Sequence, residues 1–474
     1  MSSPFNELKY KELLEGLEIS ELKLSEVKEE NRIFRIDSNF FKKELVSLDK
    51  KIKGKAHFFI PEGNIVSGPF GSSLKSSAYL SEGIPFVRIE NIKGGFSISK
   101  ENMIYISDFD NNRLKSSQLF TNDLILSKVG NTIGFYARVD EEMKECNISE
   151  NNIGIKLDNY ATERKHFILT YLNTDIGYKL TIRRTSGNAQ PKLNVFDVSE
   201  IPIPILSEYF EKKISKAILD SQTKLTESKS LYAEAEDILL SELGLKGWQP
   251  NNNPVNIKQL KESFMASGRL DAEYYQAKYE DYSDLIKQYK GGSDSLANIC
   301  FVNDKNFNPS DDGKYKYIEL SNIGNSGEIT GCTTSIGAEL PSRARRLVHT
   351  NDVIVSSIEG SLQSVALVTD EYDNAICSTG FYVVNSTTIN PETLLVLFKS
   401  EPMQNLLKQG CSGTILTAIG KTEFQNLVMP KIRKEIQTEI AEYVQKSMSL
   451  RGEAKKLLDQ AKRMVEKEIE EGTF

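Results

Sequence analysis

Cysteine and histidine are both scarce in this chain of 474 residues. The five cysteines are odd in number and no two lie closer than 32 positions, which excludes a C-x-x-C pair for a zinc ribbon or a thiol redox centre. Scattered, unpaired cysteines are typical of a reducing compartment, and we expect the cytoplasm. Three histidines, His57, His166 and His349, leave too few imidazoles for a His-ligated metal, so we expect no metal site.

Long apolar runs are also missing. No apolar stretch approaches the ~18 residues that a membrane-spanning helix needs. The N-terminal stretch MSSPFNELKYKELLEGLE lacks the apolar core of a signal peptide. We therefore expect neither a membrane span nor a secretory signal.

The motifs of common enzyme classes are absent. Gly420-Lys421-Thr422 resembles the end of a phosphate-binding loop, but the required glycine at position 415 is Ile415. No G-x-G-x-x-G, no G-x-S-x-G and no Asn/Asp-Pro-Pro-aromatic tetrapeptide of the amino-methyltransferases occurs. We therefore expect no catalysis by this chain and no cofactor bound to it.

Basic residues do not outnumber acidic ones: 59 Lys and Arg stand against 66 Asp and Glu, a net charge of −7. At first sight this argues against a nucleic-acid partner, because such proteins usually carry a basic excess. This net charge is an average over segments of opposite charge. Residues 1–31 carry four Lys and eight Glu, whereas residues 164–192 hold six Lys or Arg and one acid. The net charge therefore does not exclude DNA.

What the chain does have is an internal duplication. At ~150 residues per domain its length suggests about three domains, but four sequence anchors recur in the same order, with offsets that drift from 234 to about 226 positions. A period this long means that each copy is a domain. The anchors are Arg35–Phe41 with Arg269–Tyr275, Phe86–Ile92 with Tyr317–Ile323, Thr121–Ser127 with Thr350–Ser356, and Ser186-Gly187 and Ile201–Ile205 with Ser412-Gly413 and Leu427–Ile432.

Each copy ends in a long segment almost free of Gly and Pro, about 207–243 and 431–470. Apolar residues recur there every seven positions, which is typical of a coiled-coil seam. A parallel seam of small residues (Ser221, Ser228, Ala235; Ser447, Ala454, Ala461) permits close approach. We expect two antiparallel helices of about 55–60 Å; the alternative is that each helix merely covers its own domain. The predicted packing residues are Ile218, Leu225, Tyr232 and Leu239, and Tyr443, Leu450, Leu457 and Met464.

The predicted fold class is α+β: two pseudo-equivalent mixed α/β domains separated by two long antiparallel coiled-coil helices. The predicted segments are 1–31, an acidic N-terminal segment; 32–206, the first domain; 207–247, the first long helix; 248–265, a linker; 266–430, the second domain; and 431–474, the second long helix.

Polar and basic loops are the candidate binding sites. Arginine can read guanine, and Asn and Gln can read adenine, while Gly, Ser and Lys suit phosphate contacts. The alternatives are a solvated basic loop and, for Gly68–Lys75, an ordinary turn. The candidate DNA-binding residues are Ser72, Ser73, Lys75, Arg88, Lys128, Asn131, Arg183, Arg184, Asn188, Gln190, Lys192, Arg343, Arg345, Arg346, Gln363 and Lys421.

With these features the sequence resembles the specificity (S) subunit of Type I restriction-modification systems over about residues 32–470. The resemblance lies in the duplicated layout of domain and long helix, Gly68-Pro-Phe-Gly71-Ser-Ser, the two Thr-Asn-Asp sequences, and Ser186-Gly-Asn-Ala-Gln-Pro-Lys-Leu193 leading to Ile201-Pro-Ile-Pro204. The second copy departs at Ser412-Gly-Thr-Ile-Leu-Thr417, has no recognisable Gly-Pro-Phe-Gly loop, and has no counterpart of residues 1–31.

The resemblance implies that both domains are target-recognition domains, each reading one half of a bipartite DNA site, with the helical rod setting the spacing. Two methyltransferase subunits would dock on the chain and methylate adenine by base flipping, with S-adenosylmethionine bound in those partners. Restriction (nuclease/translocase) subunits could join them. Two alternatives remain: a fused methyltransferase-specificity protein, and a coiled-coil adaptor that assembles partners without reading DNA.

Overall fold

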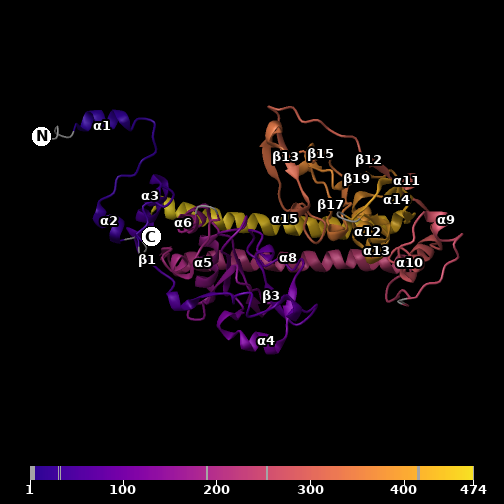
Figure 1. Ribbon diagram of the computed structural model, residues 1–474, viewed down its shortest axis with the longest axis horizontal. Helices are drawn as coiled ribbons and strands as arrows, with labels where there is room; N and C mark the ends of the chain where they lie inside the picture. Colours follow the sequence, from indigo (N-terminus) through magenta and orange to yellow (C-terminus); the bar gives the residue numbers. More distant parts are fainter. Residues whose placement is uncertain are drawn as a thin grey trace. The chain divides into compact units, whose positions relative to one another are not determined.

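The computed structural model describes residues 6–29, 31, 34–187, 190–251, 253, 255–413 and 417–472. The chain forms two compact units (Figure 1). Unit 1 comprises Met1–Gln222 and Ala454–Phe474, and unit 2 comprises Thr223–Glu453. Each unit thus contains one domain-sized segment and a part of each long helix. Within the described ranges, no helix combines the length and apolar character needed to cross a bilayer.

Unit 1 is built on two four-stranded sheets. The first has the order β2-β9-β6-β7 and is antiparallel, and the second has the order β4-β3-β8-β5, with β3 and β8 parallel. A two-stranded pair, β1-β10, completes the strands. The bounds are β1 His57–Phe58, β2 Ile65–Ser67, β3 Ile84–Val87, β4 Ile104–Ile106, β5 Leu119–Phe120, β6 Leu124–Ser127, β7 Tyr136–Arg138, β8 Glu145–Ile148, β9 Asn152–Ile155 and β10 Ile203–Pro204.

Helices pack against the first sheet of unit 1 to form its main core. Phe167 and Tyr171 of α5 are fully buried with Leu124 of β6 and Tyr136 of β7. Burial of these large side chains is the main stabilising term of the unit. The helices are α1 Glu7–Leu13, α2 Leu24–Glu29, α3 Lys43–Lys53, α4 Asp108–Arg113, α5 Thr162–Leu172, α6 Asp175–Arg183 and α7 Val195–Ser199.

Unit 2 repeats this plan. Its sheets have the orders β12-β19-β16-β17 and β14-β13-β18-β15, again with one parallel pair, β13 and β18. The pairs β11-β22 and β20-β21 complete it. The bounds are β11 Ser293–Ser295, β12 Phe301–Asn303, β13 Lys314–Ile318, β14 Thr333–Ile336, β15 Ala344–Leu347, β16 Val353–Ser356, β17 Val365–Leu367, β18 Ile376–Ser378, β19 Phe381–Asn385, β20 Cys411–Ser412, β21 Ala418–Ile419 and β22 Val428–Pro430; α9 Phe264–Ser267, α10 Ala277–Lys287, α11 Leu296–Ile299, α12 Pro391–Lys399, α13 Glu401–Gly410 and α14 Lys421–Asn426.

The recurring Thr-Asn-Asp sequences make the same turn in both units. Asn122 and Asn351 have φ of 71° and 73°, a left-handed conformation that Asn tolerates better than most residues. The carboxylates that follow accept backbone N–H groups 2.9 Å away, Asp123 from Phe120 and Asp352 from His349. The shared turn and the shared strand order confirm the predicted α+β class with two pseudo-equivalent units.

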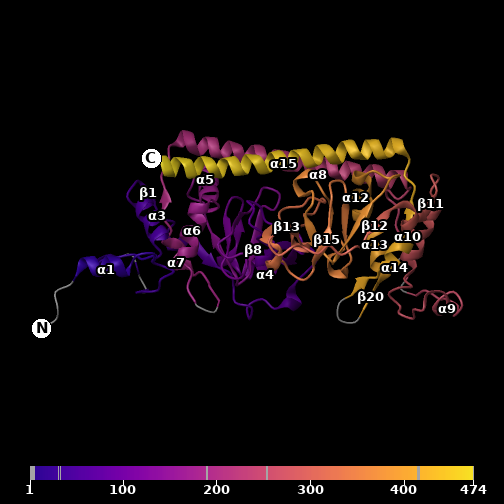
Figure 2. The ribbon, with the colours of Figure 1, turned by 90° about the horizontal axis from the view of Figure 1, so that it is seen from above.

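The long helices are α8, Glu208–Glu242, and α15, Lys434–Glu471. Within unit 2 they run antiparallel (Figure 2), because Ser228 and Ser447 hydrogen-bond at 2.9 Å while Glu242, later in α8, pairs with Arg433, ahead of α15, at 2.7 Å. Gly452 lies inside α15 without interrupting it.

The predicted packing residues are buried to different degrees. Among its residues Ile218, Tyr232, Leu239 and Leu450 are buried, but Leu225, Tyr443, Leu457 and Met464 are only partly buried. The small-residue seam is the more deeply buried one: Ser221, Ser228, Ala235, Ser447, Ala454 and Ala461 are all at most 1% exposed. Small side chains let the backbones approach closely, so the large residues flank the contact.

Candidate nucleic-acid interface

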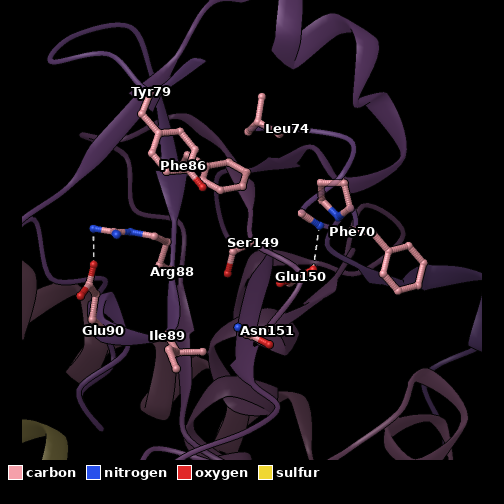
Figure 3. Close-up of a pocket in the computed structure, with 12 residues that line it drawn as sticks. Phe70, Leu74, Tyr79, Phe86, Arg88, Ile89, Glu90, Ser149, Glu150 and Asn151 are labelled. Atoms are coloured by element: carbon pink, nitrogen blue, oxygen red, sulfur yellow. Dashed lines mark hydrogen bonds and ion pairs between the residues drawn. The ribbon is translucent and has the colours of Figure 1, made fainter. Parts of the chain in front are cut away.

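The Gly68–Lys75 loop of unit 1 follows β2 and is held rigidly. Gly68 is required there, because a Cβ would lie 2.0 Å from the carbonyl oxygen of Ser149. The Gly71 N–H donates to Glu150 Oε2 at 2.7 Å, and the Ser73 carbonyl accepts from Arg113 at 2.8 Å. The braced loop presents Phe70 with 79% of its surface exposed (Figure 3).

A hollow of about 250 Å³ lies beside this loop. Phe70, Tyr79 and Phe86 supply aromatic surface, and Arg88 and Glu150 supply charge (Figure 3). Arg88 forms an ion pair with Glu90 and donates to the Asn102 carbonyl at 2.9 Å, so its guanidinium is held in place. The hollow combines stacking surface with fixed polar groups.

Lys128 and Lys192 extend this surface. The Lys128 amine donates to Ser67 Oγ at 3.2 Å, and residues Val129 and Lys192 form a β-bridge. Burial lowers the pKa of Lys128, and the nearby positive charge of Lys192 lowers it further, while Glu150 acts in the opposite direction. Lys128 and Lys192 therefore both add positive charge beside the Glu150 carboxylate.

The structure therefore brings most of the predicted residues of the first copy onto one surface, which we call the polar face of unit 1. The backbone N–H of Lys128 donates to the Asn151 carbonyl at 3.1 Å, and Gly130 lies against Ile89, which joins the separate loops. Ser72, Lys75, Asn131, Gln190 and Lys192 are exposed, whereas Ser73, Arg88 and Lys128 are half-buried. Asn188 lies outside the described residues. The polar face comprises Gly68–Lys75, Arg88–Glu90, Lys128–Asn131, Ser149–Asn151 and Gln190–Lys192.

Arg183 and Arg184 do not belong to it. They are 2% and 3% exposed. Arg183 pairs with buried Asp49 at 2.9 Å, and Arg184 pairs with Glu200 at 2.6 Å. Burial alone would raise the pKa of Asp49, but the charges of Arg183, Lys53 and Arg184 outweigh it and lower that pKa. The expectation that these arginines contact DNA is wrong in this geometry, because the end of α6 packs into the unit and carries them inward.

The role of Arg183 is to hold the first sequence anchor. Its Nε donates to the Phe40 carbonyl at 2.9 Å, and its own carbonyl accepts from Arg35 at 3.4 Å. Arg35 makes two hydrogen bonds to Asp37 and lies over the Phe40 ring. The Arg-x-Asp sequence is thus clamped onto α6.

Unit 2 contains the same clamp with glutamine in place of arginine. The Gln409 side-chain amide donates to the Tyr274 carbonyl at 3.1 Å, and the main-chain carbonyl of Gln409 accepts from Arg269 at 3.3 Å. Arg269 makes two hydrogen bonds to Asp271 and lies over the Tyr274 ring. The recurrence of Arg, Asp and an aromatic residue in this anchor is therefore explained by a structural clamp.

In unit 2 the loop after β12 takes the place of the Gly-Pro-Phe-Gly loop. Arg345 donates to Asn308 at 3.1 Å and Arg346 to Asn306 at 2.7 Å, so both brace this loop. Lys421 pairs with Asp304 at 2.5 Å in the same loop. Arg343 is exposed, and its carbonyl accepts from Thr379 N–H at 2.8 Å.

Gln363 is exposed and lies beside α12, where its carbonyl accepts from Lys399 at 2.8 Å. The main-chain carbonyl of Gln363 thus contacts a helix and not the loop after β12.

Sequence reasoning missed Glu150, Asn151 and Phe70. Glu150 and Asn151 lie in the turn between β8 and β9, and β8 is the parallel neighbour of β3, which precedes Arg88. The polar turn after β8 marks Glu150 and Asn151 as candidate binding residues, but only once the parallel pairing of β8 with β3 is known. Over the described ranges, no cluster of three or more His, Cys, Asp or Glu side chains could hold a metal ion.

No protein-family model matches the chain, and no curated protein matches it in sequence. Among solved structures, the Type I restriction-modification system S subunit from M. genitalium matches at 13% identity and a TM-score of 0.36, over 87% of this chain and 94% of that chain. The HsdS subunit from Thermoanaerobacter tengcongensis matches at 14% identity and 0.27, over 87% and 96%. A chain from a structure describing complex assembly and conformational transition of the type I R-M system matches at 15% and 0.27, over 88% and 97%.

Proposed function

We propose that this chain is a non-catalytic DNA sequence-recognition subunit of a Type I restriction-modification complex, in which each unit reads one half of a bipartite site. The polar face of unit 1 carries the proposal. It gathers exposed Lys, Asn and Gln side chains from loops far apart in sequence onto a rigid frame, the arrangement that phosphate contact and base reading require.

The chemistry of the face divides between two tasks. Lys75, Lys128 and Lys192 neutralise phosphates, and a phosphate beside Lys128 stabilises the charged form of an amine whose pKa is lowered mainly by burial. Asn131 and Gln190 supply amide groups that can pair with adenine edges in the major groove. In unit 2, Arg343 takes the exposed position while Arg345 and Arg346 shape the loop.

On this proposal the chain recognises the DNA sequence, and its partner subunits catalyse the reaction. Two methyltransferase subunits, one for each unit, bind S-adenosylmethionine and methylate a flipped adenine. The long helices α8 and α15 set the distance between the half-sites. Restriction subunits join the same complex where the system includes them.

The test is the DNA affinity of the purified chain with Lys128→Ala and Lys192→Ala combined. Losing two phosphate contacts lowers the slope of log affinity against log salt by about 2. Fluorescence anisotropy over a salt series measures this slope, and Lys213→Ala, at an exposed lysine on α8 outside the polar face, is the control. An unchanged affinity and slope would favour the adaptor that assembles partners without reading DNA.

A further inference from the structure

The exposed large apolar side chains of this protein are concentrated in two short stretches. Of 24 such residues in the described chain, 13 lie in residues 8–36 or 255–270. These stretches are about a tenth of the sequence, so a random scatter would place only two or three there. We call them the approach segments, because each one leads directly into an Arg-x-Asp clamp.

The approach segments hold the same position in the two units. The first leads into Arg35–Asp37 and the second into Arg269–Asp271. At the residue before the arginine the backbone is left-handed in both, with φ of 55° at Phe34 and 71° at Gly268. The chain therefore enters the clamp with the same bend in each unit. Residues 255–268 are thus the positional counterpart of the N-terminal segment, although the sequence alone shows no counterpart of residues 1–31.

One apolar side chain is exposed at the same place in both clamps. Ile36 is 86% exposed and Leu270 is 74% exposed. Their neighbours Arg35 and Asp37, or Arg269 and Asp271, make the clamp, so Ile36 and Leu270 project away from it. The clamp explains why Arg, Asp and the aromatic recur; it does not explain an exposed aliphatic residue at the middle position in both.

We propose that the two approach segments are docking sites for two copies of one protein subunit, one copy on each unit, with Ile36 and Leu270 as the anchors. This deepens the proposed function, because it assigns the contact surface of the methyltransferase subunits. A surface that occurs twice in the same frame fits an occupant that binds twice. Ile and Leu have equal volume, so one apolar pocket of that subunit accepts either.

Charge does not define the occupant. Residues 1–31 carry a net charge of −4, whereas residues 255–268 carry two Lys and one Glu. Recognition common to both sites therefore rests on apolar burial, and the differing charges tune each site separately. Large apolar side chains left exposed in clusters are typical of protein interfaces.

The experiment counts bound subunits by native mass spectrometry, using the purified methyltransferase subunit encoded with this chain. The full-length chain binds two copies. Ile36→Asp and Leu270→Asp each remove one copy, with affinity at the altered site about a hundredfold weaker, and the double variant binds none. Ile36→Leu and Leu270→Ile retain two copies, because they preserve the side-chain volume.

Controls separate docking from folding. Phe109→Asp in unit 1 and Ile336→Asp in unit 2 place the same charge at exposed apolar positions outside the approach segments, and both retain two copies. The thermal unfolding midpoint and the DNA affinity of the isolated double variant match those of the unaltered chain.

Three outcomes would overturn the inference. If the double variant still binds two copies, the approach segments are not the docking sites, while the proposed DNA recognition is unaffected. Loss of both copies from a single variant contradicts one independent site per unit. If the unaltered chain binds no methyltransferase subunit, both this inference and the proposed methyltransferase partner are wrong. The DNA affinity of the chain then tests the remaining part of the proposed function, which is DNA recognition.

Discussion

The loops that follow β2 in unit 1 and β12 in unit 2 show the same frame with different tips. In unit 1 the loop is braced by Glu150 and projects Phe70 outward. In unit 2 arginines from β15 brace the loop, and Phe307 packs against Tyr315 with ring centroids 5.8 Å apart. The strands and clamps below are shared. Buried contacts therefore fix the duplicated frame, whereas the loops are free to differ.

The largest expected difference between the units concerns their clamps. Arg183→Ala leaves buried Asp49 with only Lys53 and Arg184 as cationic partners and should destabilise unit 1 by about 3 kcal/mol. Gln409→Ala removes one neutral side-chain hydrogen bond, to the Tyr274 carbonyl, and should cost unit 2 only about 1 kcal/mol. The single tryptophan, Trp248, packs on Tyr282 in unit 2. Urea unfolding followed by its fluorescence therefore reports unit 2, while circular dichroism reports both. Equal losses from the two variants would contradict the comparison.

The second prediction concerns acid stability. Because the pKa of Asp49 is lowered in the folded state, its ionised form stabilises unit 1 at pH values above its unfolded pKa of about 3.9. That contribution is lost as the pH falls through the lower, folded pKa. Asp49→Asn should remove this dependence, so the variant and the unaltered chain converge in stability at the lowest pH. Unfolding midpoints from pH 7 to 2 measure it, and a constant difference between the two would contradict it.

A third prediction tests the rigidity of the first loop. Gly68→Ala places a Cβ against the Ser149 carbonyl, so the backbone must shift, at a cost of about 1–3 kcal/mol. Unit 1 should also bind its half-site more weakly, because the polar face is displaced. Gly63→Ala is the control, since nothing lies within 4 Å of its Cβ. Denaturation and DNA titration together check this, and equal behaviour of both variants would refute it.

The smallest expected effect is at the loop tips. Phe70→Ala should lower affinity for the half-site read by unit 1 by about 1 kcal/mol, through lost stacking or apolar contact with bases, and leave stability unchanged. Phe307→Ala should instead destabilise unit 2, because its ring packs against Tyr315. Titration with DNA containing one half-site at a time separates the two effects.

Some elements could be predicted and others could not. The heptad pattern predicts α8 and α15, and the Thr-Asn-Asp turns recur because Asn adopts the left-handed conformation that the turn requires. The deeper burial of the small-residue seam was not predictable, since a seven-residue period fits either seam. The burial of Arg183 and Arg184 depends on Asp49, which lies more than 130 positions earlier. A local basic cluster carries no information about such a partner.

The sequence by itself determined the duplication, the α+β class and the two long helices, because these follow from local patterns and from order along the chain. Tertiary structure alone decided which charged residues face solvent. Glu150 reaches the Gly71 loop, Asp49 neutralises Arg183, and Lys128 lies near Lys192 only because distant strands and helices pack together. Burying a charge requires a partner, and that partner is fixed by the fold and not by sequence neighbourhood.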